Sequence, residues 1–414
     1  RLGKGAYALA AVREVLGDSY FNHLANLPDL VLLMDESHRY RAQAGMRALR
    51  GRRPLPVHGQ DRMKVASSLV SGLHPTPELA AEAVRNALQG ASLQRADGVL
   101  LFLTRDYVRH APPAIVAAAR AAGTLQVSGC TAFGLLTEQG WLLDQPGAAA
   151  LVFAHPAPPA AADDTQPLLS FTGQHTLPYA WQAMPERAGL LDTEAVSWSH
   201  GRVAEQPGAE IRLAGVHTRL CLAPGLRRLN LPLTVNAATG YDLRQLGGLA
   251  PIDSLRRHLP TELRAEPPLH QIVVTRAIPA TEPAAEVFTW DEPGIPILNA
   301  NADGSLTLAE PLAIGEQVHW AIRQPLSAEQ DMRQSLLAAV DPEKRPDFAL
   351  MFSCLGRGPL FYGNDDRDLL VFREQFPGVP LIGAYGSGQI APAGGGNRLF
   401  QNTVVTLLCE SAHV

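Results

Sequence analysis

The sequence predicts an α/β fold made of two related α/β lobes, with mixed sheets and Gly-rich turns at strand ends. Three observations lead to this prediction. Short continuous apolar runs bounded by turn residues, such as 96–104 and 347–354, indicate buried strands. Helix signals alternate with these runs, which favours helices layered on sheets. An internal repeat relates the two halves of the chain and indicates that both lobes share one architecture.

The composition restricts the class of protein. The 414 residues are enough for two or three domains, and 46% of them are hydrophobic. No apolar run reaches the ~18 residues that a membrane span needs, and the first residues carry charges where a signal peptide has an apolar core. The four cysteines form no C-x-x-C pair, which argues against a disulfide scaffold or a zinc site. We therefore expect a cytoplasmic protein with no membrane contact, metal or cofactor.

Charge is unevenly distributed along the chain. Residues 1–62 carry a net charge of +4, the remainder carries −9, and together they give the net −5 of the whole chain. Nucleic-acid affinity comes largely from neutralising phosphates with basic side chains. An acidic main body therefore argues against a nucleic-acid partner.

The N-terminal half of the repeat begins with a strand that opens at Met63. A helix is predicted after it, because Thr76 can serve as N-cap and Pro77 stands at the first helical position. The apolar stripe of this helix consists of Leu79, Ala80, Val84, Ala87 and Leu88. Residues 96–104 form the next predicted strand.

Three further segments complete this half. A short helix is bracketed by Pro112, Pro113 and Gly123, and residues 124–130 are the expected strand after it. Segment 157–167 has no periodicity and is predicted to be a linker or surface loop.

The rest of the chain is first strand-rich and then α/β. Several apolar runs between 168 and 325 predict strands, and Asp303-Gly304 is a hairpin turn between two of them. A capping-box pattern formed by Ser327 and Gln330 predicts the start of a helix. The remaining predicted elements are a strand at 347–354, a helix at 366–376 and strands at 379–386 and 402–409.

The internal repeat is the most informative feature of the sequence. At an offset of 254, residues 129–154 align without gaps with residues 383–408, and 97–104 pairs with 347–354 at an offset of 250. The glycines that coincide are Gly129 with Gly383, Gly134 with Gly388 and Gly140 with Gly394. Glycine turns at strand ends can form anion-binding concavities, and α/β proteins usually bind ligands beyond the carboxyl ends of strands.

At these residues the chain resembles the FIST family, a sensory module of prokaryotic signalling proteins with N-terminal and C-terminal FIST domains. The motifs that carry the resemblance are "DFALMFSCLGRGPLFYG", "GVPLIGAYGSGQIAP" and "FQNTVVTLL" in the C-terminal half, and "ADGVLLFLT", "VSGCTAFGLL" and the segment from 215 to 259 in the N-terminal half. The resemblance covers about 63–410. It predicts a FIST N-terminal-like domain at 63–250 and a FIST C-terminal-like domain at 251–414.

The resemblance implies that the protein binds a small molecule, such as an amino acid or another small carboxylate, and has no catalytic activity. Because the chain shows no kinase, cyclase or methyl-accepting segment, the signal is expected to pass to a separate downstream signalling protein. The family usually has an acidic residue where this chain has Gln389. The preferred ligand can therefore differ from that of the family.

The predicted ligand site lies at the two repeated strand ends. Arg357 can pair a carboxylate through its planar fork, and Cys354 lines the wall. The other residues assigned to this site are Gly383, Tyr385, Gly386, Gly388, Gln389, Asn402, Gly129 and Cys130. The alternative is structural, with Cys354 a small buried side chain, Arg357 a surface arginine and the glycines ordinary turn residues.

Two enzymatic alternatives compete with the sensory interpretation. The stretch "DLVLLMDESHRY" resembles the magnesium-binding motif of DEAH-type superfamily 2 helicases, with Asp35 and Glu36 as its carboxylates. A phosphate loop and a second helicase lobe are missing, so residues 1–62 are interpreted as a helicase-like remnant, a fusion or an extension. A cysteine-dependent hydrolase would use Cys354, but no histidine lies between His319 and His413 in the sequence to suggest its base.

Overall fold

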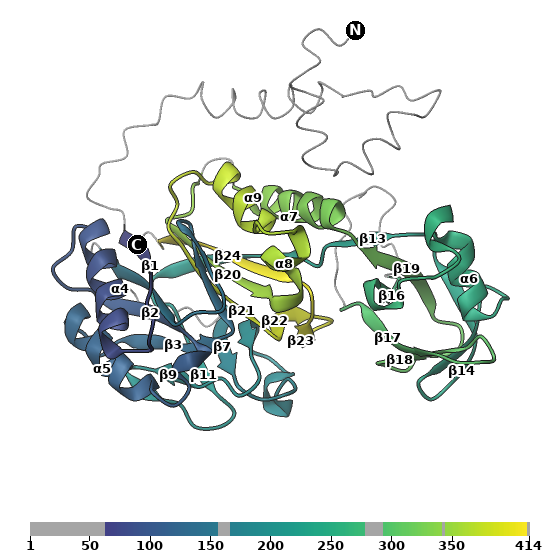
Figure 1. The fold of residues 1–414 in the computed structure, drawn as a ribbon, viewed down its shortest axis with the longest axis horizontal. Helices are drawn as coiled ribbons and strands as arrows, with labels where there is room; N and C mark the ends of the chain where they lie inside the picture. The colour runs from purple at the N-terminus through teal and green to yellow at the C-terminus, as the bar shows by residue number, and fades with distance from the viewer. Residues whose placement is uncertain (1–62, 156–165, 278–292, 342–343, 412–414) are drawn as a thin grey trace, which may run out of the picture. The chain divides into compact units, whose positions relative to one another are not determined.

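Two sheets of the same design carry the internal repeat. The computed structural model describes residues 63–155, 166–277, 293–341 and 344–411, all within one compact unit (Figure 1). The first sheet has the order β1-β6-β2-β3-β9-β10. Its strands are β1 (Lys64–Ser71), β2 (Gly98–Thr104), β3 (Val127–Ala132), β6 (Gly147–Ala154), β9 (Ser197–Ser199) and β10 (Arg202–Val203).

The second sheet has the order β12-β24-β20-β21-β4-β5. Its strands are β4 (Gly134–Thr137), β5 (Gly140–Leu142), β12 (Val216–Ala223), β20 (Phe348–Cys354), β21 (Leu381–Gly386) and β24 (Val404–Ser411). In both sheets a central parallel pair, β2–β3 or β20–β21, is followed outward by two antiparallel strands. The predicted repeat therefore corresponds to strands in equivalent positions.

Two glycines of the repeat have the same steric role. Gly129 faces Leu101 across the parallel pair of the first sheet, and Gly383 faces Met351 in the second. A Cβ atom at either glycine would lie 1.8 Å from the carbonyl oxygen of the residue opposite. Neither position has room for a side chain, so glycine is required for the parallel strands to pair in this register.

The two halves exchange strands, which the two-lobe prediction did not include. The hairpin β4–β5 of the N-terminal half extends the second sheet, where β4 runs antiparallel to β21. The hairpin β22–β23 of the C-terminal half joins a third sheet of order β11-β7-β8-β22-β23. The remaining strands of that sheet are β7 (Leu168–Thr172), β8 (Arg187–Leu191), β11 (Ala209–Ile211), β22 (Gly388–Ala393) and β23 (Gly396–Phe400).

One apolar core joins these three sheets. At its centre Phe102, Phe171 and Phe352, one from each sheet, contact each other edge-on with ring centroids 5.4 to 6.0 Å apart. Helices α4 (Pro77–Gly90) and α5 (Ala111–Ala122) cover the outer face of the first sheet. Helices α7 (Pro325–Ala339) and α9 (Arg367–Gln375) cover that of the second.

The strand-rich middle of the chain forms an antiparallel barrel among the described residues. Pairing runs in a circle through β19, β14, β15, β18, β17 and β16 and back to β19, while β13 (Leu226–Arg228) also pairs with β19. The circle consists of β14 (Leu233–Thr239), β15 (Asp242–Leu246), β16 (Ile272–Arg276), β17 (Ile295–Ala300), β18 (Leu306–Leu308) and β19 (Gln317–Arg323). Leu255 and Leu259, in and just after α6 (Pro251–His258), belong to the barrel core. The domain division at 250 and 251, where α6 begins, stays a prediction.

Most local predictions are confirmed. Thr76 is the N-cap of α4, Gly123 ends α5 in the left-handed region at φ 68°, and Asp303-Gly304 lies in the turn between β17 and β18. The predicted start of α7 at Ser327 is wrong, because the helix already begins at Pro325, whose fixed φ suits the first helical position. The predicted linker 157–167 falls mostly outside the described residues, as does the whole of 1–62.

Candidate functional site

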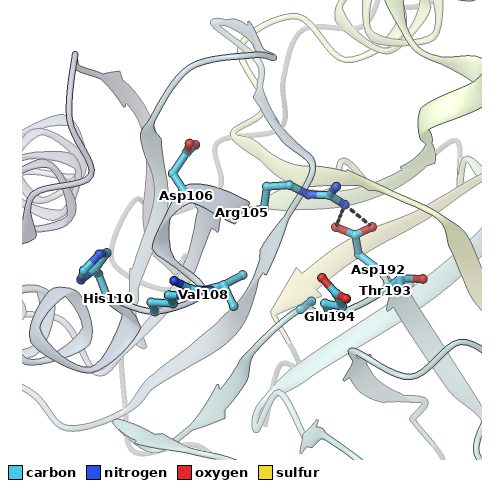
Figure 2. Close-up of a pocket in the computed structure, with 9 residues that line it drawn as sticks. Arg105, Asp106, Val108, His110, Asp192, Thr193 and Glu194 are labelled. Atoms are coloured by element: carbon cyan, nitrogen blue, oxygen red, sulfur yellow. Dashed lines mark hydrogen bonds and ion pairs between the residues drawn. The ribbon is translucent and has the colours of Figure 1, made fainter.

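A cavity of about 320 Å³ lies beyond the carboxyl end of β2 (Figure 2). One wall comes from Arg105 to His110, the segment that connects β2 to α5 and includes the 3₁₀ turn η1 (Arg105–Tyr107). The other wall comes from residues 192–195, which connect β8 to β9. The cavity therefore stands where α/β proteins usually bind ligands, at the end of a parallel strand.

The segment after β2 forms the first wall of the cavity because the side chains of Thr104 and Tyr107 hold it in place. Thr104 accepts a hydrogen bond from the backbone N–H of Gly147 at 3.1 Å and donates to Asp106 at 2.8 Å. The fully buried Tyr107 donates its hydroxyl to the carbonyl of Thr76 at 2.8 Å. Burial raises the pKa of Tyr107 to about 12, so this hydroxyl keeps its proton.

An ion pair crosses the cavity floor. Figure 2 shows Arg105 reaching to Asp192, and its Nη2 lies 3.2 and 3.1 Å from the two carboxylate oxygens. The guanidinium also stacks over the ring of Phe133, with its Cζ 4.8 Å from the centroid. The side chain of Arg105 is 49% exposed, while that of Asp192 is only 2% exposed. Arg105 is thus accessible to a ligand from the cavity, whereas Asp192 is part of the wall.

Asp192 also connects the cavity to the C-terminal half. Ser387, between β21 and β22, donates its hydroxyl to Asp192 at 2.9 Å. Burial raises the pKa of Asp192, although the contacts with Ser387 and Arg105 act in the opposite direction. The same Ser387 accepts a weak contact from the Cys354 thiol through its carbonyl, at 3.9 Å. Asp192 therefore links Arg105 by hydrogen bonds to Ser387, in the connection between β21 and β22.

Three charged side chains of the cavity have no partner among the described residues. These are Arg109, His110 and Glu194, which make no hydrogen bond or ion pair through their side chains. Glu194 also has a left-handed backbone, with φ 67°. Such a conformation costs about 1–3 kcal/mol in a non-glycine residue and is found mostly at functional sites. The cavity therefore offers free groups of both charge signs.

The structure brings together part of the site predicted from sequence. Gly356, in the turn η5 (Leu355–Arg357), would place a Cβ 2.4 Å from the Asn402 side chain and 3.9 Å from the Cys354 sulfur. A Cβ at Gly358 would lie 3.1 Å from the ring of Tyr385. Cys354, Arg357, Tyr385 and Asn402 therefore surround one short segment.

Arg357 is engaged within the protein. Its side chain is 2% exposed and donates to both carboxylate oxygens of Asp368, at 3.0 and 2.9 Å. It also donates to the carbonyl oxygens of Ala223 and Ala328. Tyr362 donates its hydroxyl to the same Asp368 at 3.0 Å. The guanidinium therefore has an internal carboxylate partner in the position that the sequence analysis assigned to a ligand.

The remaining predicted site residues are buried within the sheets. Cys130 lies in the shared core, and Gly129 and Gly383 are required by strand pairing. A Cβ at Gly386 would meet Leu190, and one at Gly388 would meet Leu399. Gln389 is fully buried, and neither atom of its amide has a hydrogen-bond partner in the described residues. The assignment of these residues to a ligand site stays a prediction.

Sequence reasoning missed Arg105, Arg109, Asp192, Glu194 and Ser387. Arg105 occupies the position of Leu355 at the repeat offset of 250, so the repeat contained a signal for this strand end. Asp192 is 87 residues from Arg105 and 195 residues from Ser387. No local pattern connects residues that far apart.

Comparison with known proteins supports part of the predicted resemblance. Residues 294–392 match the FIST C domain. An uncharacterized protein of Mycobacterium tuberculosis strain H37Rv is 28% identical over 195 residues, and one of Mycobacterium bovis is 29% identical over 191 residues. Each alignment covers 46% of this chain and 50% of the relative, so the chain spans about half the length of these curated relatives.

A shorter match is to a protein with a descriptive name. F-box only protein 22 of Pongo abelii is 45% identical over 60 residues, which is 14% of each chain. None of these matches is to a helicase, so the helicase-like interpretation of 1–62 has no support from them. The resemblance to FIST is thus confirmed for residues 294–392, which lie within the predicted C-terminal domain. The structure adds that no helix among the described residues is long and apolar enough to cross a membrane.

Proposed function

We propose that this protein is a sensory protein that binds a small carboxylate-bearing metabolite, such as an amino acid, in the cavity between Arg109 and Glu194. The carrying observation is the set of unpaired charges of both signs at the end of β2. The cavity volume of about 320 Å³ also lies in the usual range for small-molecule sites, about 300–1,000 Å³.

The proposed contacts follow from the charges. The planar guanidinium of Arg109 suits a carboxylate, and an imidazole N–H of His110 would add a second donor. The carboxylate of Glu194 is the acceptor for an ammonium group. Helix α5 adds few backbone donors near its start, because Pro112 and Pro113 lack N–H groups. Recognition is therefore assigned to side chains.

The signal would leave through Ser387. A ligand carboxylate that competes for Arg105 weakens the pairing of Arg105 with Asp192. Because Asp192 also accepts a hydrogen bond from Ser387, the change reaches Ser387. Ser387 lies within the residues that match the FIST C domain. We propose that the resulting change in the C-terminal half is read by a separate downstream signalling protein.

A thermal-shift screen with amino acids and small carboxylates tests the binding proposal. At least one compound should raise the melting temperature of the wild type, and Arg109→Gln and Glu194→Gln should both reduce that shift. The matched control is Arg120→Gln, an exposed arginine at the other end of α5. A screen without any hit, or a hit that Arg109→Gln and Glu194→Gln leave unchanged, would contradict the proposal.

The proposal contains no catalytic step. ATP turnover that is abolished by Glu36→Gln would instead support the helicase-like alternative. A hydrolytic activity lost in Cys354→Ser would support the cysteine-dependent one. Either result would replace the sensory function by an enzymatic one.

A further inference from the structure

A second cavity, far smaller than the first, lies beside η5 in the C-terminal half. Its volume is about 10 Å³, and the polar side chains that line it are Arg323, Arg357 and Asn402. No acidic side chain lines it among the described residues. Its polar side-chain lining is therefore made of two guanidinium groups and one amide.

The two arginines differ in how their charges are balanced. Arg357 is neutralised by Asp368, as described above. Arg323, the last residue of β19, makes no ion pair with any described residue. Its Nε is buried and has no hydrogen-bond partner in the part of the chain that the structure describes. Burial is the main cause that lowers the pKa of Arg323; Cys354 acts in the opposite direction, and the neighbouring Arg357 lowers the pKa further. Among the described residues no carboxylate pairs with this positive charge.

The amide nitrogen of Asn402 is a further donor in the lining of this cavity. Its amide fits its neighbours when its oxygen faces Arg323, where it accepts from Nη1 at 2.8 Å and Nη2 at 3.2 Å. The amide nitrogen then takes the position next to Gly356, where a Cβ would lie 2.4 Å away. Asn402 reaches this place through a left-handed backbone, with φ 52°. The cavity is thus surrounded by side-chain donors.

An uncompensated charge of this kind is costly. A partly buried guanidinium without a counter-charge loses hydration, and at Arg323 the Asn402 oxygen replaces it at the two Nη atoms but not at Nε. An anion in the cavity would accept from the orphaned Nε and balance the excess charge. A cavity of about 10 Å³ has room for about one water-sized particle. Among common anions, a monatomic one therefore fits this space better than a carboxylate, phosphate or sulfate.

We propose that the cavity formed by Arg323, Asn402 and Gly356 binds one monatomic anion, chloride. This site is separate from the cavity at Arg109 and does not depend on the proposed sensory function. It would fix the end of β19 against η5 and thus join the barrel to the second sheet.

Thermal unfolding at constant ionic strength, with chloride replacing gluconate, tests the proposal in solution. Because an anion bound only to the folded state stabilises it by mass action, chloride should raise the melting temperature by about 2 °C or more. Arg323→Gln should abolish this dependence. The control Arg227→Gln removes an exposed arginine from neighbouring β13 and should retain it. An equal chloride effect in Arg323→Gln, or none in the wild type, would overturn the proposal.

A crystal of the wild-type chain soaked in bromide gives a test that needs no variant. The expected result is an anomalous peak between the Nε of Arg323 and the amide of Asn402. A water molecule at that place, with no anomalous signal, would overturn the proposal even if Arg323→Gln fails to fold.

Discussion

The two parallel strand pairs, β2–β3 and β20–β21, have the same topology. The space beyond their carboxyl ends differs, because it is an open cavity in one case and is occupied by side chains in the other. Beyond β2 lies an open cavity with Arg109, His110 and Glu194, whose side chains have no partner among the residues that the structure describes. Beyond β20 the equivalent space is largely filled by Arg357, Asp368 and their hydrogen-bond partners, and only the cavity of about 10 Å³ beside η5 is left. The comparison shows that the repeated fold supplies the location, and that the side chains after each strand decide whether the space is open or filled.

The buried residue of each 3₁₀ turn shows this difference most directly. Tyr107 in η1 and Arg357 in η5 are related by the repeat offset of 250, and both are buried. Each donates to a backbone carbonyl, that of Thr76, the N-cap of α4, in one case and that of Ala223, the last residue of β12, in the other. Tyrosine completes this contact without a charge. Arginine needs Asp368 as well, and the pair fills the space.

The largest expected effect comes from breaking the filled site. Asp368→Ala leaves the Arg357 guanidinium buried and unpaired, which should lower the free energy of unfolding by about 3–5 kcal/mol. Urea denaturation measures the loss. Asp365→Ala, at an exposed acidic residue just before the N-cap of α9, is the control and should change little. A loss below about 1 kcal/mol, typical of surface ion pairs, would mean that the pair is not structural.

The second prediction concerns the feature that the two sheets share. Gly129→Ala and Gly383→Ala should each destabilise the protein by about 3 kcal/mol or more, because the added Cβ meets a backbone carbonyl. Gly140→Ala is the control, since nothing lies within 4 Å of its Cβ position. If only one of Gly129→Ala and Gly383→Ala is destabilised, the two glycines do not have the same steric role in the two sheets.

A pH dependence distinguishes the filled site from the open one. Burial, followed by the charge of Asp368, raises the pKa of Asp366 to about 6 in the folded protein. Since the folded pKa exceeds the ordinary value of 3.8, the stabilising contribution is complete below about pH 4 and is lost as the pH rises through 6.

Comparison with Asp366→Asn isolates this contribution. Asparagine is also a good N-cap for α9, where Asp366 accepts from the Leu369 N–H. Between pH 4 and 7 the wild type should lose up to about 3 kcal/mol relative to the variant, as expected for a shift of about two units. Parallel stability curves for the two proteins would show that Asp366 titrates normally.

The smallest effect is expected at the connection between the two regions. Ser387→Ala removes the hydrogen bond to Asp192 and should cost about 1 kcal/mol of stability. Ligand affinity should change little, whereas hydrogen exchange in β21 and β22 should no longer respond to the ligand. If the ligand changes hydrogen exchange in β21 and β22 of the variant as much as in the wild type, Ser387 is excluded as the route of the signal.

Local structure could be predicted from the sequence because its signals are local. Pro77, Gly123 and Asp303-Gly304 mark helix and turn positions through backbone preferences that depend on few neighbours. The closure of the barrel by β19 and β16 could not be predicted in this way. It depends on pairing between residues such as Val274 and Trp320, which are far apart in the sequence.

The site shows the same limit. The repeat directed attention to strand ends, and the structure gathers Cys354, Tyr385 and Asn402 around η5, but their role in binding stays a prediction. The sequence could not reveal that Asp368 already pairs with Arg357, because spacing alone does not show which side of a turn a carboxylate faces. Nor could it show that Asp192 and Ser387 meet, since 195 residues separate them.

A crystal structure of the full chain with a compound from the thermal-shift screen tests the central claim most directly. The account predicts ligand density between Arg109 and Glu194, with the Arg357–Asp368 pair intact. Density against the Arg357 guanidinium, with Asp368 displaced, would contradict it and would assign binding to the C-terminal site.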